Sequence, residues 1–100
     1  MTGAELQDSC RPINMVHGTR SYAQFGNMSQ CIGYIVGVSD LTIISTLPEP
    51  LICRPREVTD GNVAQVVLAY LDRHPSDLHL EAVFLVTYAL MQAYPCPASK

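Results

Sequence analysis

Four cysteines are the residues of this chain with the clearest chemical potential. They stand at Cys10, Cys31, Cys53 and Cys96, an even number spread along 100 residues with no C-x-x-C pair. Zinc ribbons and thioredoxin-type sites need closely spaced pairs, so this spacing fits neither. We therefore interpret the cysteines as two disulfides formed in an oxidising compartment. The alternative is four buried free thiols in a cytosolic protein, because cysteine is readily buried.

Catalysis would require a base beside one of these thiols, and the available histidines are His17, His74 and His79. No stretch resembles a nucleophile elbow or the surroundings of a papain-like cysteine. His74 and His79 are five residues apart across Pro75, which is not the i, i+4 spacing of two zinc ligands on one helix. We expect both histidines to bond to backbone groups of a helix turn. We predict no enzyme activity, no metal and no cofactor.

Composition bounds the class of protein. Hydrophobic residues make up 48% of the chain and charged residues 15%, which predicts one folded domain over residues 1–100. The net charge is -3 and the six Lys and Arg are scattered, so no nucleic acid partner is expected. No apolar run reaches the roughly 18 residues of a spanning helix, so no membrane insertion is expected. The N-terminal stretch MTGAELQDSC lacks the layout of a signal peptide, so an exported form would have lost its leader and gained Met1 as a start residue.

Two helices are predicted in the C-terminal half, joined by the short HPSD connection. In the first, from Thr59 to His74, apolar side chains recur at i, i+3, i+4 and i+7, and Thr59 suits the N-cap. The second runs over 77–94, with Ser76 or Asp77 as its cap, and is apolar nearly all round. It should therefore be the central helix or bury its outer side in an oligomer. The short connection predicts an antiparallel hairpin of these two helices.

The stretch QCIGYIVGVSD, residues 30–40, contains two glycines four residues apart. Isoleucine and valine form strands readily, but no other run offers a pairing partner, so a helix over 28–44 is favoured over a short buried strand. On this helix Gly33 and Gly37 share one face, where we expect another helix to approach closely. The same glycines weaken the helix by roughly 1 kcal/mol each relative to alanine, so packing must compensate.

The remaining segments complete an all-α fold, a small helical bundle of four to five helices braced by two disulfides. Residues 2–10 are expected to form a short helix with Leu6 and Cys10 facing inward. Gly, Pro, Asn and Ser punctuate 11–27, and prolines punctuate 45–57, so both are predicted loops.

The predicted hairpin also favours one pairing of the cysteines. The start of its first helix should lie beside the end of its second, so Cys53 and Cys96, just outside those ends, should meet. Cys10 and Cys31 are then left to join the first helix of the chain to the second.

Three blocks of the sequence, taken together, resemble a known family. They are CIGYIVGVSD, CRPREVTDGNVAQVVLAYLDRHPSDLH and a last apolar helix that closes as AYPCP. In this order, over residues 28–97, they resemble the Rap/Tai-type immunity proteins, which protect bacteria against type VI secretion amidase effectors. Cys31, Cys53 and Cys96 match cysteines of that family. The resemblance implies a small all-helical periplasmic protein, often dimeric, that binds a peptidoglycan-cleaving cysteine amidase and blocks its active-site groove.

On this resemblance we expect an immunity protein that inhibits its peptidoglycan amidase effector by steric blockade, as a homodimer. A rigid scaffold with exposed loops suits that role, because little conformational entropy is lost on binding. The loops expected to make contact are 45–57 and 72–79. The candidate contact residues are Glu49, Arg54, Arg56, Glu57, Asp72, Arg73, Ser76 and Asp77. The alternatives are a small periplasmic helical chaperone that opens in acid and a binding module for another toxin.

Overall fold

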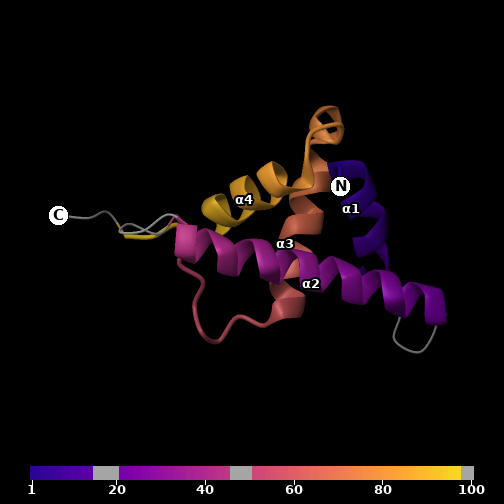
Figure 1. Ribbon diagram of the computed structural model, residues 1–100, viewed down its shortest axis with the longest axis horizontal. Coiled ribbons are helices and arrows are strands. Elements are labelled where there is room, and N and C mark those ends of the chain that lie inside the picture. The colour runs from indigo at the N-terminus through magenta and orange to yellow at the C-terminus, as the bar shows by residue number, and fades with distance from the viewer. Residues whose placement is uncertain (15–20, 46–50, 98–100) are drawn as a thin grey trace.

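The computed structural model describes residues 1–14, 21–45 and 51–97, and helices account for most of them. In chain order the elements are α1 (Gly3–Cys10), the 3-10 turn η1 (Arg11–Asn14), α2 (Tyr22–Ser45), α3 (Asp60–Arg73), the 3-10 turn η2 (Pro75–Asp77) and α4 (Ala82–Ala93). Figure 1 shows α2 along the long axis of the molecule with α3 crossing behind it, and α2 contacts each of the other three helices. The described residues form no strand and carry two disulfides, which confirms the predicted all-α fold.

Side-chain caps fix the starts of α1 and α3. Thr2 Oγ1 accepts a hydrogen bond from the Glu5 backbone N–H (3.3 Å), and the Glu5 carboxylate accepts one from the Thr2 backbone N–H (2.9 Å). This capping box satisfies N–H groups that the first helical turn leaves without a partner. At α3, Thr59 Oγ1 accepts from the Asn62 N–H at 3.1 Å, which confirms the predicted N-cap.

Helix α2 begins at Tyr22 rather than near Met28, so part of the predicted 11–27 loop is helical. The same predicted loop also contains η1. Ser21 Oγ accepts from the Gln24 N–H (3.2 Å), while the Gln24 side-chain oxygen accepts from the Ser21 N–H (2.7 Å). These two bonds form a second capping box, which starts the helix ahead of the glycine and asparagine that had indicated a loop.

Helix α4 begins at Ala82, not at residue 77 as predicted. Ser76 and Asp77 lie in η2 and do not cap α4. The N-cap is Glu81, whose side chain makes no capping hydrogen bond.

Docking of the N-terminal segment explains this late start. The N–H groups of Gly3 and Ala4 donate to the carbonyls of Leu80 and Leu78, both at 2.9 Å. In an α-helix these two carbonyls would point along the axis toward later N–H groups of the same helix. Docking of α1 and an earlier start of α4 therefore compete for the same residues.

One hydrophobic core joins the four helices. Of the apolar stripe predicted for 59–74, α3 buries Val63, Val67 and Leu71, while Val66 and Tyr70 are half-buried. The buried core residues are Leu6, Cys10, Cys31, Ile35, Ile52, Val63, Ala64, Val67, Leu68, Leu71, Ala82, Leu85, Val86, Ala89 and Leu90. The inward orientation expected for Leu6 and Cys10 of α1 is confirmed.

The outer face of α2 carries Gly33 and Gly37, so the expected close approach of another helix at these glycines is wrong. Both glycines are exposed, and a Cβ added to either would meet no atom within 4 Å. The buried face of α2 is formed by Cys31, Ile35 and Ser39, at the i, i+4, i+8 spacing of one helix face. The glycines lie on the opposite face.

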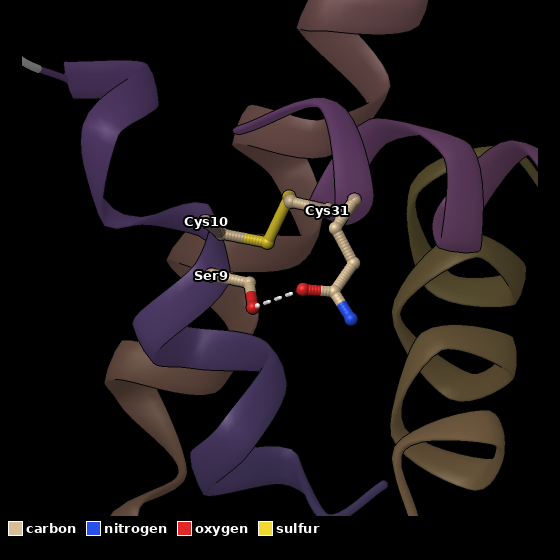
Figure 2. Close-up of a disulfide and its surroundings, with 4 residues drawn as sticks. Ser9, Cys10 and Cys31 are labelled. Atoms are coloured by element: carbon tan, nitrogen blue, oxygen red, sulfur yellow. Dashed lines mark hydrogen bonds between the residues drawn. A yellow bond between two sulfur atoms is a disulfide. The ribbon is translucent and has the colours of Figure 1, made fainter. Parts of the chain in front are cut away.

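The predicted Cys10–Cys31 disulfide is confirmed and joins the end of α1 to α2. Its Cα–Cα distance is 5.1 Å, within the usual range, and both cysteines are fully buried. Figure 2 shows the bridge beside a hydrogen bond from Ser9 Oγ to the side-chain oxygen of Gln30 (3.4 Å). Both contacts hold α1 against α2.

The predicted Cys53–Cys96 disulfide is also confirmed, with a Cα–Cα distance of 4.9 Å. The two segments it joins also form an antiparallel bridge between Ile52 and Pro95, and the Cys53 N–H donates to the Tyr94 carbonyl at 2.8 Å. Figure 1 shows α4 crossing α3 at an angle instead of lying antiparallel alongside it. The cysteines therefore meet because the segment before α3 reaches the end of α4, not because the two helices form a regular hairpin.

Candidate partner-binding cleft

A surface cleft of about 500 Å³ lies where the C-terminal part of α2 faces the segment that precedes α3. Its lining residues are Ser39, Asp40, Ile52, Cys53, Arg54, Pro55 and Arg56. One wall is helical, and the other is a segment tied to the C-terminal end of the chain by the Cys53–Cys96 disulfide. Two of the predicted contact residues, Arg54 and Arg56, belong to this cleft.

Arg54 uses its guanidinium to shape the cleft wall. It donates twice to the Val58 carbonyl, from Nε at 3.1 Å and from Nη2 at 2.6 Å. Nη2 also donates to the Asp60 carboxylate at 2.7 Å, where the two side chains form an ion pair. The Val58 N–H donates to the Pro55 carbonyl at 3.2 Å and so closes a β-turn. Arg54 therefore couples this turn to the first residue of α3.

Arg56 and Asp40 are the other charged groups of the cleft, and both are exposed. Arg56 lies in the turn between Pro55 and Val58, whereas Asp40 lies on α2. Among the residues described, neither side chain has an opposite charge within salt-bridge distance. Besides Arg54, which is paired with Asp60, the cleft thus presents one positive and one negative group on its two walls.

The second set of predicted contact residues lies at the other end of α3. Asp72 and Arg73 belong to its last turn, and Ser76 and Asp77 follow in η2. A helix of 14 residues is about 21 Å long, so the structure does not bring this set together with the cleft. Figure 1 shows the two connections at opposite ends of α3.

The remaining predicted contact residues differ in the bonds that they make within the protein. The Asp72 carboxylate accepts from Gln7 Nε2 at 2.8 Å and pairs with Arg11 at 3.5 Å, so it helps to hold α1 against α3. Glu57 is exposed beside Arg56 in the turn. Glu49 lies outside the described residues.

The cysteines and His74 make bonds that hold the fold together. All four cysteines are in disulfides. His74 Nδ1 lies 2.7 Å from the Tyr70 carbonyl, and because a carbonyl can only accept, Nδ1 carries the proton. This confirms the backbone role predicted for His74, while His79 is exposed and shows no such bond in the described part of the chain. In the same residues, no group of three or more His, Cys, Asp or Glu could hold a metal ion.

The outer side of α4 is a second exposed surface, and it is apolar. Phe84 and Tyr88 are 55% and 52% exposed, and Val83 is 40% exposed. The only polar residue from 82 to 91 is Thr87, whose hydroxyl donates to the Val83 carbonyl at 2.7 Å. The expectation that this helix is central is therefore wrong, and burial of its outer side in an oligomer stays a prediction.

Two titratable groups away from the cleft have shifted pKa values. Hydrogen bonds from the backbone and then the side chain of Thr2 lower the pKa of the Glu5 carboxyl. Burial raises the pKa of the Tyr34 phenol, and the negative charge of Glu81 raises it further. Helix capping and packing account for both shifts.

These features define a small all-helical protein braced by two disulfides, with a charged cleft and an apolar helix face as its candidate binding surfaces. None of the described helices combines the length and hydropathy needed to cross a membrane. The family model for Rap1a immunity proteins matches residues 2–96, and the chain belongs to this family. The match confirms the suspected family and extends it to include α1. No curated protein was found to match the chain.

Proposed function

We propose that this protein binds a type VI secretion peptidoglycan amidase in the periplasm and blocks its active-site groove. The observation that carries the proposal is the family match, which includes every helix and supports an immunity role with a toxin as partner. Inhibition by binding requires no chemistry from the inhibitor. We accordingly propose that the protein is not an enzyme and acts in stoichiometric ratio to its target.

Rigidity supports steric blockade as the mechanism. The two disulfides join residues 21 and 43 positions apart, and in the loop-entropy model they contribute about 3 and 4 kcal/mol to stability. A surface that is ordered before binding loses little conformational entropy when a partner arrives. The same disulfides support an oxidising compartment, and we propose the periplasm on this basis together with the family resemblance.

A homodimer that buries the outer side of α4 forms part of the proposal. Its support is the exposed apolar face of Val83, Phe84 and Tyr88, which carries no charge. We expect Phe84→Asp to convert a dimer into a monomer in analytical ultracentrifugation. Tyr22→Asp is the matched control, because Tyr22 is 97% exposed at the start of α2. A wild-type protein that stays monomeric at high concentration would rule out the dimer.

The decisive experiment mixes the oxidised protein with candidate type VI amidases and follows complex formation and muropeptide cleavage as the ratio rises. We expect tight binding, with cleavage reaching zero near one protein per active site. A peptidoglycan amidase of the host cell serves as the control and should keep its activity. Absence of binding across a broad panel of type VI amidases would refute the amidase as target.

A small periplasmic chaperone is the second candidate function, and the exposed apolar face of α4 is the observation that favours it. A chaperone of this kind should expose further apolar surface reversibly in acid. Binding of a hydrophobic dye, measured from pH 7 to pH 3 and back, tests this. The immunity proposal predicts little change in dye fluorescence while the protein stays folded.

A further inference from the structure

Arg54 and Arg56 stand two residues apart in the cleft but have different bonding. Arg54 donates hydrogen bonds from Nε and Nη2 to the Val58 carbonyl, and Nη2 also donates to the Asp60 carboxylate. Arg56 lies at the turn that Arg54 stabilises, and its guanidinium is exposed without an ion pair among the described residues. Only Arg56 is therefore able to give its full charge to an incoming group without loss of an internal bond.

The floor and walls of the cleft are held rigidly. Ser39 and Ile52 are 4% and 2% exposed, so the base of the cleft is part of the packed interior. The Cys53–Cys96 disulfide fixes one wall and the hydrogen bonds of Arg54 fix the turn above it. A ligand would thus meet a shape that exists before binding, with Ile52 and Ser39 at the base and charge at the rim.

We propose that this cleft is the docking site for an extended peptide segment of the protein partner that carries a carboxylate. Arg56 binds the carboxylate, and Asp40 on the opposite wall accepts a hydrogen bond from an N–H group of the same segment. Arg56 is the contact residue and Arg54 is a positioning residue. The identification of this partner as the amidase effector rests on the proposed function.

A peptide fits these features better than a free small molecule. Exposed charges bind a small ion weakly, because water and salt screen the interaction. A protein segment brings its neighbouring surface with it, which excludes water around Arg56 and Asp40 and so strengthens both contacts. The charges also match, because a peptide offers backbone N–H donors beside an acidic side chain.

The first test uses the folded, oxidised protein without any effector. The probe is the blocked peptide acetyl-Gly-Val-Glu-Gly-amide, added to ¹⁵N-labelled protein, and the same peptide with Gln in place of Glu is its control. We expect saturable changes in amide shifts at 39–40 and 52–56, with a dissociation constant in the millimolar range that rises with salt. The Arg56→Gln variant should weaken peptide binding at least threefold, while Arg11→Gln, which removes the same charge from η1 outside the cleft, should not. The inference is overturned by equal shifts with the Gln peptide, by no shifts at these positions, or by an unchanged constant in Arg56→Gln.

The second test measures amidase binding by the same variants. We expect Arg56→Gln to weaken amidase binding at least tenfold without changing Tm, and Arg11→Gln to leave binding unchanged. Arg54→Gln should lower both Tm and the affinity for the amidase, because it loosens the turn. Arg54→Lys should keep only part of the wild-type Tm and affinity. Amidase binding that is indifferent to Arg56, despite peptide binding in the cleft, would show that the effector docks elsewhere and overturn that assignment. Peptide binding without binding to any amidase would refute the proposed function and leave the cleft as an acidic-peptide site.

Discussion

The two disulfides should differ sharply in their sensitivity to reduction under native conditions. Cys53 is exposed and Cys96 is half-buried, so a dithiol reductant can attack their bridge in the folded protein. Cys10 and Cys31 are both fully buried, so their bridge is reached only after α1 detaches from the core. We predict that the Cys53–Cys96 bridge is reduced first.

The difference between the two reduction rates can be estimated from the contacts that α1 loses when it detaches from the core. Detachment exposes Leu6, which costs about 1.5–3 kcal/mol, and breaks the hydrogen bonds of Gly3 and Ala4 to the chain before α4, at about 1 kcal/mol each. An opening free energy of about 4 kcal/mol slows attack by roughly 10³-fold. Loss of the exposed bridge, which spans 43 positions, then removes about 4 kcal/mol, so the buried bridge should follow more quickly in the partly reduced protein.

Alkylation and peptide mass spectrometry measure both initial rates. Samples taken during reduction by dithiothreitol are quenched with iodoacetamide, digested and quantified for each cysteine. The Cys53→Ala/Cys96→Ala variant, which keeps only the buried bridge, provides the control and should show its reduction accelerating with urea. Equal initial rates for the two bridges, or earlier reduction of Cys10–Cys31, would show that burial of the bridge does not protect it.

Three further substitutions test the packing and the electrostatics. Gly3→Ala should destabilise the protein by about 1–3 kcal/mol, because the added Cβ would collide with the Leu85 side chain and lie 3.2 Å from the Leu78 backbone. Urea unfolding measures this loss of stability, and an unchanged midpoint would contradict the prediction. Gly33→Ala should instead stabilise the protein by about 0.5–1 kcal/mol, since the new methyl group meets no atom and alanine favours the helix. A loss of stability in the same assay would show that the outer face of α2 needs glycine. The pKa of Glu5 is lower in the folded protein than its ordinary value of 4.5, so its stabilisation is present above that value and is lost as the pH falls through the folded pKa. Glu5→Gln should therefore lower Tm at pH 7 but not at pH 2, and an equal loss at both would exclude the carboxylate charge as the cause.

Local sequence patterns predicted much of the fold, and their failures have identifiable reasons. The stripe of α3, its Thr59 cap and the short first helix follow from rules that involve only neighbouring residues. The start of α2 was also encoded locally, because S-Y-A-Q at 21–24 has the form of a capping box. It was missed because the later glycine and asparagine suggested a loop. The start of α4 was not encoded locally, since it depends on hydrogen bonds with the N-terminal segment.

The glycines of α2 and the arginines of the cleft show what spacing alone does not determine. Helical periodicity places Gly33 and Gly37 on one face, but it does not say which face is buried when apolar residues surround both. In the same way, Arg54 and Arg56 look equivalent in C-R-P-R-E. Their difference arises from the turn that brings Val58 back to the guanidinium of Arg54. The cleft itself needs the end of α2, which is distant in sequence.

The docking of α1 beside the start of α4 has a consequence for the order in which the chain folds. The Gly3 and Ala4 N–H groups find their acceptors at Leu80 and Leu78, about three-quarters of the chain away. During synthesis residues 3 and 4 emerge well before residues 78–80, so they have nothing to dock on until those residues arrive. Contacts this distant in sequence slow folding, because the intervening chain must be ordered before they form. We therefore expect protection against the toxin to begin only after the segment that contains Leu78 and Leu80 has been made, since no shorter nascent form has its first helix in place.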